Sequence, residues 1–219
     1  MWGPRAVLRS GRYLLDLLNT DRLNARSQIM KRFITESRQA ANREFQHQVA
    51  GIFREATPKV LENVTRIGKL RLVRESGEDI GDIDVFAIDE TRKVIVAVEV
   101  KDFELARTPA ELSNEMKKLL DGPKSAVHHH TERLAFLKSH REDVHRELQL
   151  PGSASEWQIH GEIVTSHDLL AAHFPLARSK SKAMNLVCFH DLAERSKRGQ
   201  LIRRTPNSTS KRKRRKQSR

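Results

Sequence analysis

Two adjacent apolar segments, residues 81–88 and 94–101, constrain the fold of this chain more than any other part of its sequence. Both are rich in β-branched residues and a short polar turn joins them, which is the pattern of a β-hairpin. Three ionisable residues, Asp84, Glu99 and Lys101, interrupt the apolar pattern. Side chains alternate across a strand, so Glu99 and Lys101 share one face and Asp84 can lie across the hairpin from Glu99. The sequence therefore predicts three charged groups on one half-buried patch, where they need partners or a metal ion.

The strand that carries Glu99 is expected to be buried on both of its faces. Valine occupies four alternating positions of the segment 94–101, and Ile95 and Ala97 lie between them. A strand that is apolar on both faces is typical of the centre of a sheet. The alternative is an exposed hairpin in which Glu99 and Lys101 form an ordinary surface ion pair.

Two carboxylates beside a lysine are typical of metal-assisted phosphodiester hydrolysis. Oxygen atoms of Asp84 and Glu99 can bind a hard divalent cation, with water and phosphate completing its coordination. Such a cation polarises the phosphate and acidifies a bound water molecule. Lys101 can hold that water or stabilise the charge that develops on the phosphate. These residue types predict Mg²⁺, or Mn²⁺, as the cofactor.

The spacing of these residues also carries a resemblance to a known family. Asp84, fourteen intervening residues and then Glu99-Val100-Lys101 resemble the motif of the PD-(D/E)XK nuclease superfamily, most closely its Mrr and Holliday-resolvase-like branches. The resemblance implies that Asp84 and Glu99 are metal ligands and that all three residues are catalytic. Ile83 stands where the superfamily motif has its leading proline.

The first predicted helix contains one further candidate for the site. In Mrr-like proteins an acidic residue follows a phenylalanine in this helix, whereas here Gln46 follows Phe45 and Glu44 precedes it. Glu44 lies one step from the apolar stripe and can flank the site as a fourth catalytic residue. The alternative is an ordinary exposed glutamate.

The order of the predicted elements and the resemblance indicate the same fold class. This is an α/β fold with a restriction-endonuclease-like αβββαβ core, in which helices flank a central mixed sheet. We expect an N-terminal helical appendage at 1–35, a nuclease-like domain at 36–192 and a basic disordered tail at 193–219. The Thr-Pro-Ala-Glu sequence at 108–111 is a capping box that starts a helix. Two other helices are predicted, one at 36–56 and a longer one that ends at about 148. The predicted strands are 69–74, 81–88, 94–101, 157–165 and 186–189.

The chain carries a strong excess of positive charge, with 41 Lys and Arg residues against 28 Asp and Glu residues and a net charge of +13. Such an excess indicates a polyanionic partner. The basic tail can neutralise phosphates without reading base sequence. The basic residues just after the motif can line a nucleic-acid groove or belong to the ordinary charged surface. The candidate nucleic-acid-binding residues are Arg107, Lys117, Lys118, Lys211, Arg212, Lys213, Arg214, Arg215 and Lys216.

Cysteine and histidine chemistry is not expected. The single cysteine, Cys188, fits a buried strand position better than a nucleophile and fits a reducing compartment. The ten histidines lack the spacing of a zinc site.

No apolar run approaches the roughly 20 residues that a membrane helix needs. We therefore expect a cytoplasmic protein, nucleoid-associated if bacterial, with no membrane partner.

Together these features predict a metal-dependent nuclease that hydrolyses DNA, with RNA less favoured as a substrate, in repair, recombination or defence against foreign DNA. The alternative is a nucleic-acid-binding module on the same fold that no longer cuts. The sequence leaves open the substrate structure, endo- or exonuclease action, the pathway and the oligomeric state, for which a homodimer is one option.

Overall fold

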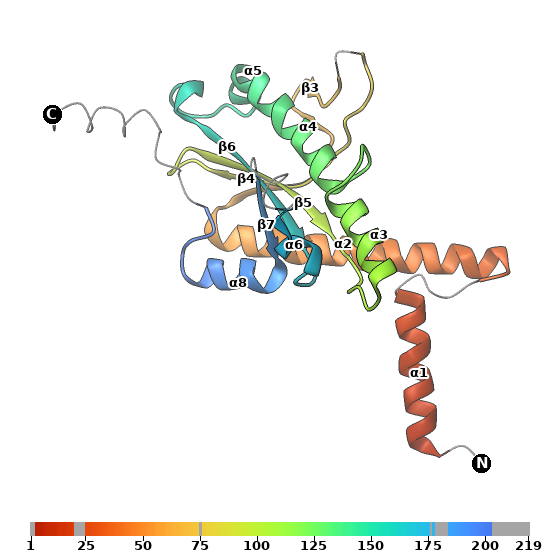
Figure 1. The fold of residues 1–219 in the computed structure, drawn as a ribbon. Coiled ribbons are helices and arrows are strands. Elements are labelled where there is room, and N and C mark those ends of the chain that lie inside the picture. The colour runs from red at the N-terminus through yellow and green to blue at the C-terminus, as the bar shows by residue number, and fades with distance from the viewer. Residues whose placement is uncertain (1–2, 20–24, 75, 176, 178–183, 203–219) are drawn as a thin grey trace.

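The computed structural model describes residues 3–19, 25–74, 76–175, 177 and 184–202. Its centre is a five-stranded sheet in the order β1 (Lys59–Val64), β4 (Ile83–Asp89), β5 (Val94–Lys101), β6 (Gln158–Thr165) and β7 (Met184–Cys188) (Figure 1). The first three of these strands are antiparallel neighbours, whereas β5, β6 and β7 run parallel. The prediction of an α/β fold with a central mixed sheet is therefore confirmed.

Strands β4 and β5 form the predicted hairpin, in which Val85 pairs with Val98. β5 lies in the middle of the sheet, and its first six residues are buried. Its valines pack on one face of the sheet, while Ile95 and Ala97 pack on the other. Burial on both faces excludes the alternative of an exposed hairpin.

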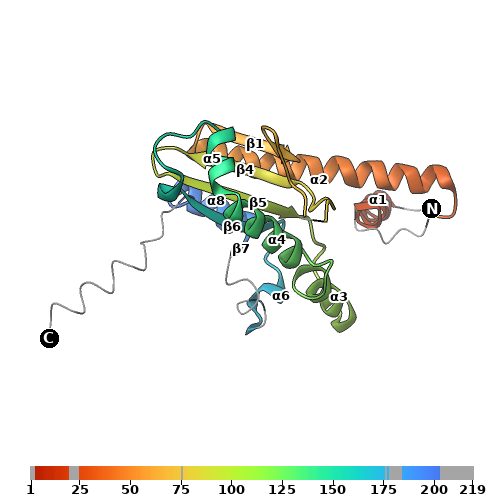
Figure 2. The same ribbon diagram turned by 90° about the horizontal axis from the view of Figure 1, so that it is seen from above.

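Helices cover both faces of the sheet, as the view from above shows (Figure 2). On one face, α2 (Gln28–Ala56) and α8 (Phe189–Lys197) pack together against the valine-rich side of β5. On the other face, α4 (Ala126–Ser139) packs against β5 and β6. The remaining elements after β5 are α3 (Pro109–Leu119), α5 (Arg141–Glu147), a short 3₁₀ helix (Ala154–Glu156) and α6 (Leu170–His173). The middle of β5 is therefore covered by helices on both faces.

The capping residues explain where two of these helices begin. Thr108 Oγ1 accepts a hydrogen bond from the backbone N–H of Glu111 at 3.2 Å, and Pro109 occupies the first position of α3. Ser125 Oγ accepts from the backbone N–H of His128 at 3.3 Å at the start of α4. Each serine or threonine satisfies a backbone donor that has no partner within its helix. The predicted start of α3 is thus confirmed.

Other predicted elements differ from the structure. The first strand of the sheet is β1, whereas the predicted strand 69–74 contains only β3 (Leu70–Arg71), which pairs with β2 (Arg66–Ile67) in a separate ribbon. β1 was missed because it is a half-exposed edge strand without an apolar run. The helix predicted to reach about 148 is divided at His140 into α4 and α5.

Both predicted domain boundaries fall within helices. α2 begins at Gln28 and crosses the boundary at 35/36. Its first turns carry apolar side chains at helical spacing, of which Ile29, Met30 and Phe33 are exposed. α8 crosses the boundary at 192/193, and Leu201 and Ile202 are buried in the core beyond it. The folded domain therefore extends at least to residue 202.

The N-terminal helix α1 (Pro4–Asn19) stands apart from the sheet (Figure 1). Its close contacts are with α2. Several of its large apolar side chains are exposed, including those of Val7, Leu8 and Leu14. In the described part of the chain, no helix combines the length and the apolar character that crossing a membrane requires. The basic tail residues Lys211 to Lys216 lie outside the described residues.

Candidate active site at the end of the β4–β5 hairpin

The structure brings Asp84, Glu99 and Lys101 together at one end of the β4–β5 hairpin. The antiparallel pairing of these strands puts Asp84 and Glu99 at neighbouring positions. Asp84 Oδ2 accepts a hydrogen bond from the backbone N–H of Val100 at 2.6 Å. Lys101 Nζ lies 2.8 Å from Glu99 Oε1. The three residues that the sequence singled out thus form one cluster of charges.

Solvent reaches the members of this cluster unequally. Glu99 is only 3% exposed, whereas the side chain of Lys101 is 41% exposed. Asp84 is half-buried. A bound molecule would therefore meet the lysine and the aspartate first, with Glu99 behind them.

Arg133 of α4 is a fourth charged member that the sequence did not reveal. Its Nη1 donates to Glu99 Oε2, and its Nε donates to the backbone carbonyl of Ile80 at 3.0 Å. Gly81 follows with φ +83°, and a Cβ there would lie 2.6 Å from Arg133 Nη2. The arginine is 7% exposed. Its guanidinium is therefore fixed beneath the cluster by a carboxylate, a carbonyl and the absence of a side chain at Gly81.

His130, one helical turn before Leu134, lies deeper beneath the same strand. It has no exposed surface, and its Nε2 is 3.1 Å from the carbonyl oxygen of Ala97. Burial lowers the pKa of His130 to about 4, although Glu99 opposes this effect. The imidazole is thus neutral at physiological pH, and Nε2 donates the proton to the carbonyl. His130 Nδ1 is buried and has no hydrogen-bond partner among the described residues.

Burial and the repulsion between the two neighbouring carboxylates, Asp84 and Glu99, determine the electrostatics of the cluster. Burial and, after it, the neighbouring charge of Glu99 together raise the pKa of Asp84 to about 7, while the hydrogen bond from the Val100 N–H works in the opposite direction. For Lys101, burial alone would lower the pKa, but Glu99 and Asp84 together outweigh it and the pKa is raised. Lys101 is therefore a permanent cation, whereas Asp84 changes its charge near neutral pH.

The donor set fits a hard divalent cation only in part. Carboxylate oxygens of Asp84 and Glu99 are suitable ligands, and a cation would relieve the repulsion that raises the Asp84 pKa. Both oxygens of Glu99, however, are already paired with Lys101 and Arg133. Across the described residues, no group of three or more His, Cys, Asp or Glu side chains is arranged to hold a metal. A cation could thus bind Asp84 directly, but it would have to replace a basic partner of Glu99.

On α2, the residue that reaches the cluster is Gln46 rather than Glu44. Gln46 is buried, and its Nε2 donates to the backbone carbonyl of Asp84 at 2.6 Å. Glu44 is exposed and accepts a hydrogen bond from Gln48 Nε2 at 3.1 Å. The structure therefore places Glu44 as an ordinary surface glutamate, because the helix turns position 46, and not position 44, toward β4.

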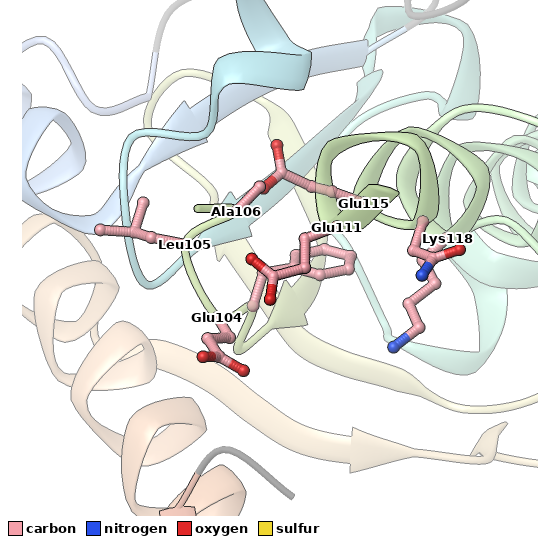
Figure 3. A pocket seen from close by; sticks show the side chains of 8 residues that line it. Glu104, Leu105, Ala106, Glu111, Glu115 and Lys118 are labelled. Atoms are coloured by element: carbon pink, nitrogen blue, oxygen red, sulfur yellow. The ribbon is translucent and has the colours of Figure 1, made fainter. Parts of the chain in front are cut away.

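The basic residues that follow β5 lie in acidic surroundings. A pocket beyond the end of β5 is lined by Glu104, Glu111, Glu115 and Lys118, and the close view shows Glu111 and Glu115 on one helix facing the segment of Glu104 (Figure 3). The backbone N–H of Arg107 donates to Glu111 Oε2 at 2.7 Å, and its guanidinium lies 3.8 Å from Glu104 Oε1. These carboxylates offset the positive charge predicted to attract nucleic acid here.

Lys117 is exposed on the same helix, α3, and has no ion pair among the described residues. It remains available to a polyanion. Arg107 and Lys118, by contrast, lie close to glutamates of the pocket in Figure 3. The three basic residues therefore do not form one continuous basic groove.

The fold and the cluster define an α/β protein whose central hairpin carries two acids and a lysine. A sequence model of the family of Upx-like anti-phage proteins matches residues 2–175. This match spans most of the chain, from α1 to the end of α6, so the protein belongs to that family and is an anti-phage defence protein. No curated protein and no solved structure matches the chain.

Proposed function

We propose that this anti-phage protein is a metal-dependent nuclease that hydrolyses phosphodiester bonds of DNA. The observation that carries the proposal is the convergence of Asp84, Glu99 and Lys101 at the end of a buried hairpin. Such a group of charges is costly to bury and contributes little to a core. The spacing of the same three residues, which resembles the PD-(D/E)XK motif, also supports the assignment.

Each residue has a distinct role in this proposal. Asp84 and Glu99 would hold a Mg²⁺ or Mn²⁺ ion, which supplies polarisation of the phosphate and an acidified water molecule when bound. Lys101 is protonated and partly exposed, so it donates hydrogen bonds to the attacking water or to the phosphate oxygens. The N–H of Val100 fixes the Asp84 carboxylate against the strand.

Arg133 also has a role, because it shares Glu99 with Lys101. When Arg133 is bound to Glu99, the negative charge of the carboxylate is already compensated. To hold a cation, Glu99 would have to use an oxygen that is paired here with Arg133 or Lys101. The arginine thus compensates the buried carboxylate of Glu99.

A second candidate function is a nucleic-acid-binding module that does not cut. Two observations favour it: both oxygens of Glu99 are paired with basic side chains, and Gln46 stands where a carboxylate would add a further ligand. In this case Lys101 and Arg133 would serve only to compensate the buried acids. The two candidates differ in whether a divalent cation binds at Asp84.

The experiment is a cleavage panel with purified protein on linear, circular, nicked, branched and single-stranded DNA, with Mg²⁺ or Mn²⁺. We expect cleavage of at least one substrate, its loss with EDTA, and its loss in Asp84→Asn. Glu90→Gln, which removes an exposed carboxylate at the other end of the same hairpin, is the matched control and should cleave normally. Equal cleavage by wild type and Asp84→Asn would refute the assignment of this cluster as the active site, and metal-independent DNA binding without cleavage would favour the binding module.

A further inference from the structure

A second concave site lies on the outer side of α4, away from the acidic pocket of Figure 3. It is a cavity of about 670 Å³ between α4 and the segment that contains β3, two elements that lie side by side in Figure 1. Cavities of this size are typical of sites for small molecules. It does not contain Asp84, Glu99 or Lys101.

One wall of this cavity offers a flat aromatic surface. The rings of Phe136 and His140 are stacked, with centroids 4.2 Å apart and an angle of 26° between their planes. Apolar side chains, among them Leu70 and Ile80, complete the lining around them. Aromatic walls of this kind bind planar π-systems, and nucleobases stack on them without regard to sequence.

The opposite rim is basic. Lys69, Arg71 and Arg74 line the cavity from the β3 segment. The guanidinium of Arg74 is held by Glu132 and Glu78. Lys69 and Arg71, in contrast, have exposed side chains that form no ion pair within the described residues. They are available to an anion at the mouth of the cavity.

From the flat aromatic wall and the two available cations we infer that this cavity binds a nucleotide, with its base against Phe136 and its phosphate at Lys69 and Arg71. The nucleotide can be free or can be one unit of a nucleic-acid strand, since both present the same base and phosphate. The cavity also has a physical link to the charged cluster. Ile80 lines the cavity, and its carbonyl holds Arg133, which in turn holds Glu99.

The test is a binding titration of the full chain in EDTA, so that neither metal nor cleavage is involved and the proposed nuclease activity is not needed. The probes are deoxyadenosine monophosphate, a five-nucleotide single-stranded DNA and inorganic phosphate. Phe136→Leu removes the phenyl ring of the aromatic wall and keeps an apolar side chain. The double variant Lys69→Gln/Arg71→Gln removes the two available cations without touching the core. Lys31→Gln/Arg43→Gln removes the same charge from exposed positions of α2, on the opposite face of the sheet.

We expect a nucleotide probe to bind more tightly than phosphate, and both cavity variants to weaken it about tenfold while the α2 variant does not. Binding of the monophosphate would identify a free nucleotide as sufficient, and binding of the pentanucleotide alone would identify a strand. The inference is overturned if neither nucleotide probe binds, if phosphate binds as tightly as the nucleotide, or if Lys69→Gln/Arg71→Gln binds like the wild type. None of these results depends on Asp84, so cleavage by the charged cluster is judged separately.

Discussion

Glu99 and Glu162 are both buried in the central sheet, and each is paired with an arginine from a covering helix. Glu162 of β6 accepts hydrogen bonds from Arg195 of α8 at 2.8 Å and from Asn185 of β7 at 3.2 Å. Glu99 of β5 is held on the opposite face by Arg133 of α4. Each glutamate is only 3% exposed. By burial and by the type of partner, the two sites are alike.

They differ in what surrounds the ion pair. The Glu162 site contains one carboxylate, an arginine and an amide, and both donors bind the same oxygen, Oε1, while burial raises the pKa of Glu162. The Glu99 site adds a second carboxylate, Asp84, and a half-exposed amine, Lys101. A second acid makes burial more costly without improving the packing. In the proposed function, the added acid and lysine are therefore the features that distinguish the Glu99 site from the arginine–glutamate pair of Glu162.

The largest effect on stability is expected from removing the arginine of each pair. Arg133→Met should lower the free energy of unfolding by about 3 kcal/mol, because it leaves Glu99 buried beside Asp84 with only Lys101 to compensate both. Arg195→Met should cost less, about 1–2 kcal/mol, because the Arg195 side chain is 29% exposed and water can replace it beside Glu162. Urea denaturation of both variants checks this order. A smaller loss for Arg133→Met would mean that its ion pair is not the tighter of the two.

The next prediction concerns pH, because the Asp84 pKa of about 7 means that a cation must displace a proton below neutrality. The affinity for Mn²⁺ should rise as the pH increases from 6 to about 7.5 and then level off, by up to about tenfold per pH unit. Isothermal titration across this range measures the affinity. Asp84→Asn should lose the pH dependence together with most of the binding, whereas Glu162→Gln should retain both.

Without metal, the same raised pKa predicts the opposite trend in stability. The folded chain keeps a proton on Asp84 that the unfolded chain releases, so the wild type should lose stability as the pH rises from about 4 to about 7. Asp84→Asn does not titrate, so its stability relative to the wild type should increase over this range and stay constant above it. Thermal unfolding of both proteins at pH 5 and pH 8 compares them. A constant difference would show that the Asp84 pKa is not raised in the folded state.

The smallest expected effect comes from two glycines. Gly81 and Gly152 both have positive φ, +83° and +80°, so an alanine at either position should cost about 1 kcal/mol from backbone strain. At Gly81 the new Cβ would also meet Arg133 Nη2 beneath the cluster, whereas at Gly152 it meets the side chains of Glu156 and Lys93. Gly81→Ala should therefore alter Mn²⁺ binding and cleavage, and Gly152→Ala should alter neither. If the two variants bind Mn²⁺ and cleave equally well, the position of Arg133 does not matter for the function of the site.

The sequence predicted the part of this site that lies on continuous strands. Asp84, Glu99 and Lys101 interrupt an apolar pattern, and the period of a strand places them on one face, so their convergence could be predicted locally. Arg133 and His130 could not be placed in the same way. They lie on a helix more than thirty residues after Glu99, and only the packing of α4 on β5 brings them beneath the strand. Their one visible signal is their position near Leu134 and Leu137 on the buried stripe of that helix.

The missed parts of the fold have a similar explanation. β1 is an edge strand with exposed side chains, so it lacks the apolar run that marked β4 and β5. The first turns of α2 carry exposed apolar side chains, among them Ile29, Met30 and Phe33, and were predicted to belong to the N-terminal appendage rather than to this helix. Gln46 was recognised as a departure from the Mrr-like motif, but its hydrogen bond to the Asp84 carbonyl depends on how α2 packs against β4. Patterns along the chain thus identified the buried centre, whereas its surroundings depend on tertiary contacts.

The most direct test of the account compares the two buried glutamates in the reaction itself. Glu99→Gln and Glu162→Gln remove the same charge and keep nearly the same shape, and each leaves its arginine in place. The measurement is single-turnover cleavage, with Mg²⁺ and saturating protein, of the DNA substrate that the wild type cuts best. We predict that Glu99→Gln slows cleavage by at least about 10²-fold and that Glu162→Gln stays within about threefold of the wild type once both are shown to be folded. Cleavage by Glu99→Gln at the rate of the wild type, or an equal loss in both variants, would contradict the assignment of this hairpin as the active site.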